Sequence, residues 1–286
     1  MTDPRHAVAT DNGRYYHDPN PAFAGARYPS VTNVLDSISK PALVPWASKV
    51  AAEYAIANLP RLTRLARTDS VAAIKEIKSQ AKYVRETAAD LGTAIHAAAE
   101  ARILGLPTPV FENIEPKVIE PFIRQHLAWL NSWHVDIERD VEAAEFSVVN
   151  RTEGYAGTGD LLIWLASGAD YVRELWLIDY KSSSTRPVKS VYAENGMQLA
   201  ALRNGEVIWA PDDSEPPMPR VDHCAVLNLR SRGKALIPRR ADAASYQGFL
   251  DALRLARYLH ALDEPVEVLE PPANLTSKHR AVLEAA

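Results

Sequence analysis

Two short stretches of the sequence place carboxylates and a lysine where two apolar strands are expected to end. The stretch 157–160 reads Gly-Thr-Gly-Asp, and we expect it to form a tight turn that puts Asp160 at the head of an apolar strand. Asp179 and Lys181 follow the apolar run 175–178 in the order Asp-x-Lys. Side chains alternate along a strand, so Asp179 and Lys181 point to the same face. Two acids and a lysine that converge at one sheet end can hold a hard divalent cation and direct a water at a phosphate, which is nuclease chemistry.

Burying two carboxylates at the end of an apolar strand is costly unless a partner compensates for their charge. A cation between Asp160 and Asp179 would compensate, and the backbone carbonyl of Tyr180 offers one more oxygen ligand suited to magnesium or manganese. Lys181 would orient or help to deprotonate the attacking water and stabilise charge on the phosphate.

A histidine on an alanine-rich stretch is the next candidate ligand. Gly92, His96 and Glu100 are spaced four apart, so they share one helix face, and the alanines between them let that helix lie close to the sheet. We expect His96 to complete the metal shell or to approach the phosphate. Glu100 and Glu145 are expected to lie behind the ligands and to support them.

The helix expected after the Asp-x-Lys strand carries Gln198, which can hydrogen-bond to DNA or hold Lys181 in place. Lys189 and Tyr192, with Arg186, lie just upstream and are predicted to line a substrate groove.

Each of these residues has an ordinary structural alternative. Asp160 can cap a turn, Asp179 and Lys181 can form a simple ion pair, His96 can be a packed helix residue and Gln198 a surface amide. Their occurrence together favours the catalytic interpretation.

Charge is unevenly spread along the chain. The net charge is −4, yet residues 61–85 carry seven basic against two acidic side chains, a net +5 that leaves −9 elsewhere. The basic residues Lys75, Lys78, Lys82 and Arg85 share one helix face and form either a solvated surface or a track for substrate phosphates.

Composition bounds the class of protein. The chain has 286 residues, of which 47% are hydrophobic and 24% charged, so a well-packed globular core is expected. The single cysteine, Cys224, excludes a disulfide framework and an iron–sulfur cluster with four ligands from this chain. No signal-peptide pattern or membrane-length apolar run is present, so we expect a soluble, cytoplasmic protein.

The order of predicted elements is helices first and a mixed sheet with helices afterwards. Helices are predicted to start at Ser30 and to cover about 45–57, 69–79 and 80–104 (as two helices or one), 115–133, 190–203 and 241–262. Strands are predicted at 13–17, 142–149, 159–165, 174–181, 220–229 and 234–239. This predicts an α/β (α+β) fold, with a helical part at 1–134, a core with a central mixed sheet at 135–264, and a tail at 265–286.

The ordered set Gly-x-x-x-His-x-x-x-Glu, Gly-x-Gly-Asp, Ile-Asp-x-Lys-Ser and Gln-Leu resembles the RecB-type branch of the PD-(D/E)xK nuclease superfamily. The likeness is greatest to phage and prophage exonucleases related to the CRISPR-associated RecB-like nucleases, and it spans about residues 28–205, including Tyr28-Pro-Ser-Val-Thr-Asn-Val-Leu and Lys40-Pro-Ala-Leu-Val-Pro-Trp46-Ala.

The resemblance implies a restriction-endonuclease-like core preceded by a helical subdomain. It implies that His96, Asp160 and Asp179 bind Mg²⁺ or Mn²⁺, that Lys181 is the catalytic lysine, and that Gln198 is the helix glutamine of the family. The implied activity is hydrolysis of DNA from its ends in phage or mobile-element recombination or repair, inside a bacterial host. A phage single-strand annealing protein or a recombinase is the implied partner.

This sequence departs from the family pattern at two places. Leu202 stands where a tyrosine is common, and the cysteines that bind a cluster in many relatives are absent. An endonuclease of the same fold, a catalytically silent DNA-binding or scaffold protein, and a hydrolase of small phosphoesters remain as alternatives.

Overall fold

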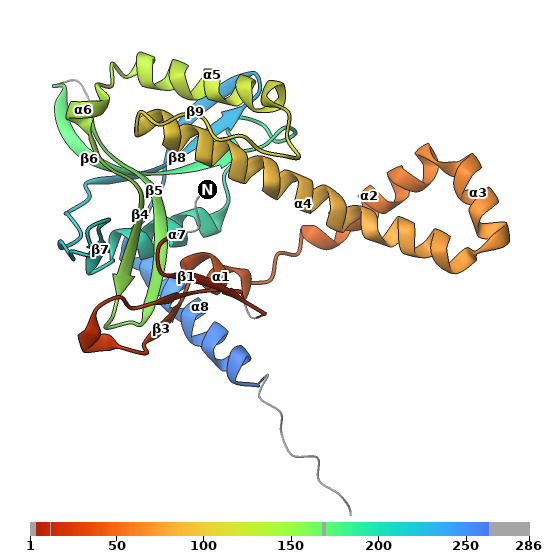
Figure 1. Ribbon diagram of the computed structural model, residues 1–286, viewed down its shortest axis with the longest axis horizontal. Helices are drawn as coiled ribbons and strands as arrows, with labels where there is room; N and C mark the ends of the chain where they lie inside the picture. The colour runs from red at the N-terminus through yellow and green to blue at the C-terminus, as the bar shows by residue number, and fades with distance from the viewer. Residues whose placement is uncertain (1–3, 12, 168–169, 263–286) are drawn as a thin grey trace, which may run out of the picture.

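The computed structural model describes residues 4–11, 13–167 and 170–262 (Figure 1). The tail predicted for 265–286 lies outside the described residues. None of the helices in the described ranges combines the length and apolarity needed to cross a bilayer.

A mixed sheet forms the centre of the described structure, with the strand order β7-β4-β5-β6-β8-β9. Its strands are β4 (Val141–Asn150), β5 (Tyr155–Ser167), β6 (Val172–Ser182), β7 (Val207–Trp209), β8 (His223–Arg230) and β9 (Gly233–Pro238). β6 and β8 run parallel, and the other neighbours run antiparallel. Apolar strands of this kind must be covered on both faces, and helices do so here.

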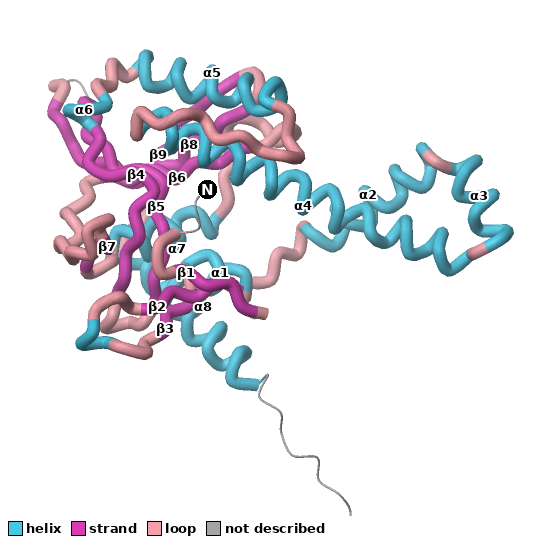
Figure 2. The backbone as a smooth tube through the Cα atoms, viewed as in Figure 1, coloured by secondary structure: helices cyan, strands magenta, loops and turns pink. Residues whose placement is uncertain are grey.

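Helices pack on both faces of the sheet, which confirms the predicted α/β class (Figures 1 and 2). On one face, α5 (Pro116–Ser132) and the C-terminal part of α4 (Ser70–Ile103) share a core with β5, β6 and β8. On the other face lie α1 (Val31–Asp36), α7 (Ala193–Arg203) and α8 (Ala243–Leu262). Residues on both sides of position 135 therefore contribute to one core.

A small second sheet was only partly predicted. It consists of β1 (Ala7–Thr10), β2 (Gly13–His17) and β3 (Arg27–Pro29), with a short 3-10 helix at Pro21–Phe23. The strand at 13–17 is confirmed. β1 and β3 were not predicted, and neither were α6 (Ile137–Asp140) and β7, because elements of three or four residues carry too little periodicity to recognise.

A helical arm projects from the body (Figure 1). It consists of α2 (Leu43–Ala57), α3 (Leu59–Thr68) and the first half of α4, which pack on one another. The predicted stretches 69–79 and 80–104 form the single helix α4, whereas α3 was not predicted. Residues 82–90 of α4 are all exposed, so this part of the helix crosses from arm to body without tertiary contacts that bury it.

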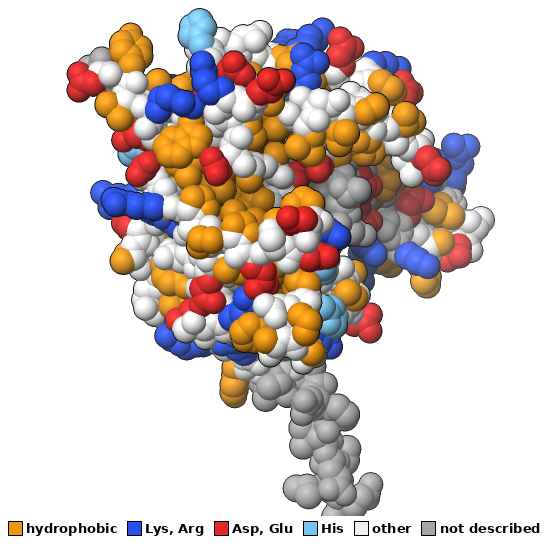
Figure 3. All heavy atoms as spheres, turned by 60° about the vertical axis from the view of Figure 1, so that its left-hand side comes forward, with side chains coloured by type: hydrophobic (Ala, Val, Ile, Leu, Met, Phe, Trp, Pro, Cys, Tyr) orange, Lys and Arg blue, Asp and Glu red, His pale blue; other side chains and the backbone are white. Residues whose placement is uncertain are grey.

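One edge of β4 is only partly paired. β7 pairs with β4 at residues 147–149 alone, because the chain turns away at Pro211, whose ring nitrogen has no hydrogen to donate. The stretch 141–146 therefore has a ladder on one side only. A cavity of about 450 Å³ lies along it. Figure 3 looks onto this side of the molecule, where hydrophobic side chains gather between acidic ones.

Candidate metal centre

The site lies where β5 and β6 separate. The two strands pair from Ser167↔Val172 to Leu161↔Ile178, and the next residues on each are Asp160 and Asp179. Beyond this point in the described structure, β5 forms a ladder with β4 and a single bridge from Ala156 to Ser30, whereas β6 forms a ladder with β8. The backbone N–H of Tyr180 donates to Asp160 Oδ2 at 2.5 Å. The carboxylate thus accepts a hydrogen bond from a backbone group of β6 beyond the end of the β5–β6 ladder. We call the point where β5 and β6 separate after Leu161 and Ile178 the fork; it opens the sheet to groups from both faces.

The predicted glycine turn before Asp160 is wrong. Gly157 and Gly159 lie inside β5, and the turn comes earlier, at residues 151–154, where Gly154 has φ +73°. A Cβ on Gly159 would lie 2.5 Å from Phe146 Cζ, and one on Gly157 would lie 2.8 Å from a methyl of Val31. These glycines therefore permit close approach of neighbouring side chains and do not turn the chain.

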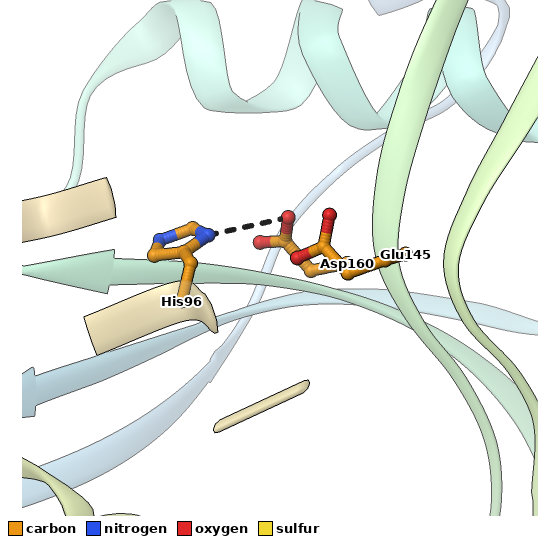
Figure 4. Close-up of side chains that lie close together, drawn as sticks. All are labelled: His96, Glu145 and Asp160. Atoms are coloured by element: carbon orange, nitrogen blue, oxygen red, sulfur yellow. Dashed lines mark ion pairs between the residues drawn. The ribbon is translucent and has the colours of Figure 1, made fainter. Parts of the chain in front are cut away.

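His96 reaches the fork from α4. Alanines on the same helix, among them Ala94, Ala98 and Ala99, are fully or almost fully buried and let α4 approach the sheet. His96 Nδ1 lies 3.5 Å from Asp160 Oδ1 (Figure 4). Burial works against a charged imidazole, but the neighbouring Asp160 carboxylate outweighs it and raises the pKa of His96. The same attraction lowers the pKa of Asp160 despite its burial.

Glu145 belongs to the cluster itself. His96, Glu145 and Asp160 each offer a ligand atom within 4.8 Å of the others (Figure 4). Glu145 adopts φ +46°, in the left-handed region that residues other than glycine rarely occupy. The half-open edge of β4 leaves its backbone free to do so, because a ladder on both sides would hold it extended. Burial and the charge of Asp160 raise the pKa of Glu145 to about 8.

From the sequence, Glu145 is predicted to lie behind the ligands and Asp179 to be one of them. Asp179 lines the same cavity, but it pairs with Lys181 and Gln198 instead. Lys181 Nζ donates to Asp179 Oδ1 at 3.0 Å and to Gln198 Oε1 at 3.2 Å, and Gln198 Nε2 donates to Asp179 Oδ1 at 2.7 Å. Asp179 and Lys181 therefore do share a face, as alternation predicted, and Gln198 fixes their relative position.

Electrostatics in this second group follow from burial and mutual charge. Burial raises the pKa of Asp179, and the neighbouring Lys181 only partly offsets it. Burial acts to lower the pKa of Lys181, but the Asp179 and Asp160 carboxylates outweigh it and raise that pKa above its usual value. The lysine therefore remains a cation at neutral pH.

Both groups line a cavity of about 160 Å³. Three buried ligand atoms in it, His96 Nδ1, Glu145 Oε1 and Asp179 Oδ2, have no hydrogen-bond partner within the described structure. His96 Nδ1 and Asp179 Oδ2 lie within ion-pair distance of Asp160 and Lys181, respectively, whereas no ion pair is recorded for Glu145 Oε1 among the described residues. Buried polar atoms without hydrogen bonds are costly, so their convergence calls for a further group between them. One imidazole nitrogen and two carboxylates form a donor set that can hold a divalent cation.

The cavity wall contains residues that the sequence analysis did not select. Arg14 and Tyr16 of β2 line it, and the Tyr16 hydroxyl and Thr158 Oγ1 are hydrogen-bonded at 2.7 Å. Nothing local in the sequence marks these residues, because the N-terminal sheet meets β5 only after folding.

The remaining predicted residues lie farther from the cluster. Glu100, one turn beyond His96 on α4, is half-buried, and its charge contributes to the raised pKa of Glu145. Lys189 and Tyr192 are exposed in the segment before α7, and Tyr192 lines a groove beside the cavity. The Tyr180 carbonyl stays a predicted metal ligand, because the cluster found in the described residues is defined by side-chain atoms alone.

The basic face predicted to follow the substrate backbone lies on the arm. Lys75, Lys78, Lys82 and Arg85 are all exposed on α4. At 1.5 Å per helical residue, Arg85 lies about 17 Å along the axis from His96, and Lys75 about 32 Å. The stripe therefore begins more than three turns from the cluster, and its role in binding DNA stays a prediction.

We compared the chain with models of protein families and with curated proteins, and neither comparison found a match.

Proposed function

We propose that this protein is a divalent-metal-dependent deoxyribonuclease that hydrolyses phosphodiester bonds from DNA ends. The observation that carries the proposal is the meeting of two groups at one strand fork. A cluster of His96, Glu145 and Asp160 with unpaired buried ligand atoms adjoins the hydrogen-bonded group of Asp179 and Lys181.

His96, Glu145 and Asp160 would hold a Mg²⁺ or Mn²⁺ ion, with Asp179 in the lining of the same cavity. Such a cation supplies Lewis-acid activation of the phosphate and a more acidic bound water. The residues themselves hold the carboxylates in fixed positions, because the fork, the Tyr180 N–H and Gln198 restrict how they can rotate.

Lys181 stabilises negative charge on the substrate phosphate. Its raised pKa keeps Lys181 protonated at neutral pH, so it donates hydrogen bonds and does not accept a proton. Of the roles predicted from the sequence, orienting the water and stabilising charge on the phosphate therefore remain, and deprotonating the water does not. Gln198 holds the ammonium group through a 3.2 Å hydrogen bond, so the charge is fixed before substrate arrives.

A polymer is favoured over a small phosphoester because the cavity does not end at the cluster. Thr32, Lys181 and Gln198 line both this cavity and an adjoining groove of about 340 Å³. The preference for DNA ends, and a place in phage or mobile-element recombination beside an annealing protein or recombinase, rest on the family resemblance.

The test is digestion of end-labelled linear DNA and closed circular DNA by the wild type and by Lys181→Ala, with Mg²⁺, Mn²⁺ or EDTA. Metal-dependent loss of linear DNA alone, absent in the variant, is the expected result. Nicking of the circle would make the protein an endonuclease. No cleavage of either DNA by the wild type would reject the activity and favour a silent DNA-binding protein.

A further inference from the structure

The groove beside the metal cavity has its own charged floor. It lies between α1, residues 183–192 and the start of α7. Its lining includes four cations, Lys40, Lys181, Arg186 and Arg230, against two carboxylates, Asp36 and Glu194. Lys40 pairs with Asp36 at 2.7 Å and Lys181 pairs with Asp179 at 2.8 Å, so the net positive charge of the groove comes from Arg186 and Arg230 against Glu194.

Arg230 shapes this floor from the end of β8. Its side chain is buried, with only 8% of the residue exposed, and no carboxylate of the described residues lies within salt-bridge distance of it. Instead, its guanidinium donates to the backbone carbonyls of Lys181 at 2.8 Å, Arg186 at 2.9 Å and Pro187 at 3.3 Å. Its remaining hydrogen bonds go to the Leu229 carbonyl at 2.8 Å and the Ser190 hydroxyl at 3.3 Å. A buried cation held by neutral dipoles leaves positive potential for an anion in the groove.

Asn228, also on β8, holds the same segment. Its amide donates to the backbone carbonyls of Val188 at 2.8 Å and Ser190 at 2.7 Å. The chain from 186 to 190 is therefore tied to the sheet at several points. Arg186 at its start, and Tyr192 two residues after its end, are therefore presented from a fixed backbone.

Arg186 and Tyr192 stand at the rim of the groove. Tyr192 is 45% exposed, and the Arg186 guanidinium lies 5.9 Å from the centre of its ring. An exposed aromatic ring beside a guanidinium matches the two parts of a nucleotide, because bases stack on aromatic rings and guanidinium groups bind phosphate.

We propose that this groove is a subsite for the nucleotide that adjoins the scissile phosphate, with Arg186 on its phosphate and Tyr192 against its base. The inference rests on the proposed phosphodiesterase function and assigns residues that bind substrate without taking part in the chemistry. A substrate that lacks a flanking nucleotide gains nothing from the groove.

The experiment compares two substrates in Mn²⁺. Bis(p-nitrophenyl) phosphate is a diester with no flanking nucleotide, and a short single-stranded oligothymidylate has several. Arg186→Ala and Tyr192→Ala are each expected to lower kcat/KM on the oligonucleotide about tenfold or more, mainly through KM, and to leave the small diester unchanged. Tyr192→Phe should retain the wild-type rate, because the ring remains. Arg124→Ala, an exposed arginine on α5, is the matched control.

Equal losses on both substrates, or no loss on the oligonucleotide, would overturn the subsite. Failure of the proposed function gives a different pattern, in which the wild type cleaves neither substrate. In that case the affinity for the labelled oligonucleotide, measured by fluorescence anisotropy in Ca²⁺, tests the subsite without cleavage. Weaker binding by Arg186→Ala supports the subsite, and unchanged binding rejects it.

Discussion

Replacing Glu145 by glutamine should stabilise the metal-free protein and remove its response to metal. Glutamine keeps the shape of the side chain but cannot ionise. In the folded protein the pKa of Glu145 is raised from its usual 4.5 to about 8 by burial and by Asp160. The folded protein thus binds this proton more tightly than the unfolded chain does. As pH rises from 4.5 to about 8, Glu145 therefore contributes a progressive loss of folding stability.

The size of this effect follows from the pKa difference. Each pKa unit corresponds to about 1.4 kcal/mol, so the rise from 4.5 to about 8 corresponds to about 5 kcal/mol at the upper end of the window. A cation bound at the cluster would offset this cost, because it stabilises the ionised carboxylate. At a concentration about one hundred times its dissociation constant, a cation adds about 2.7 kcal/mol to the stability.

The assay is urea unfolding followed by tryptophan fluorescence, in EDTA and in Mn²⁺, at both ends of the pH window. In EDTA, wild type should lose several kcal/mol more than Glu145→Gln as pH rises, and Mn²⁺ should restore stability in wild type alone. The control is Glu142→Gln, which changes an exposed carboxylate on the same strand. The reasoning is refuted if Glu145→Gln keeps the pH dependence of wild type or is stabilised by Mn²⁺ as strongly.

Three further outcomes follow from the structure. Lys181→Ala should lower the rate of DNA cleavage by orders of magnitude while DNA binding survives, because the lysine stabilises charge that develops during the reaction. Normal turnover by this variant would show that Lys181 is not part of the active site. Joint truncation of Lys78 and Lys82 to alanine should weaken DNA binding and reduce the slope of log affinity against log salt by about 2, and an unchanged slope would make the stripe an ordinary solvated helix face. Gly159→Ala should cost about 1–3 kcal/mol of unfolding free energy, because its Cβ would meet the Phe146 ring, and Phe146→Leu should recover part of the loss in thermal denaturation.

The two strands that carry the candidate site were predictable because their signals are local. Runs of apolar residues gave β5 and β6, and alternation along β6 was enough to put Asp179 and Lys181 on one face, where they form an ion pair at 2.8 Å. The spacing of His96 on an alanine-rich helix was likewise sufficient to bring it to Asp160.

The place of Glu145 was not predictable from the sequence. In the structure Glu145 adopts a positive φ beside the unpaired edge of β4, and the extent of that edge depends on where β7 ends. The turn predicted at Gly157 and Gly159 was wrong for a related reason. Glycine is as useful for close side-chain approach as for a turn, and only the position of Phe146 and Val31 distinguishes the two.

Nor did the charge pattern reveal the arm. The spacing of Lys75 and Lys78 defined a helix face correctly but carried no information on where that helix lies. Propensity favours a continuous helix through residues 82–90, yet nothing in the sequence indicates that this stretch is left without cover.

The uninterrupted course of α4 sets a length scale for any DNA that contacts both arm and cluster. His96 and Lys78 lie on one helix, about 27 Å apart along its axis. At 3.4 Å per nucleotide along duplex DNA, this distance spans about eight nucleotides. A shorter fragment would meet His96 and its neighbours without reaching Lys78. Affinity should therefore rise as fragments lengthen from about five nucleotides, where they reach Arg85, to about eight, where they reach Lys78. Inserting or deleting whole turns between His96 and Arg85, in the exposed stretch 86–90, should move this rise in proportion.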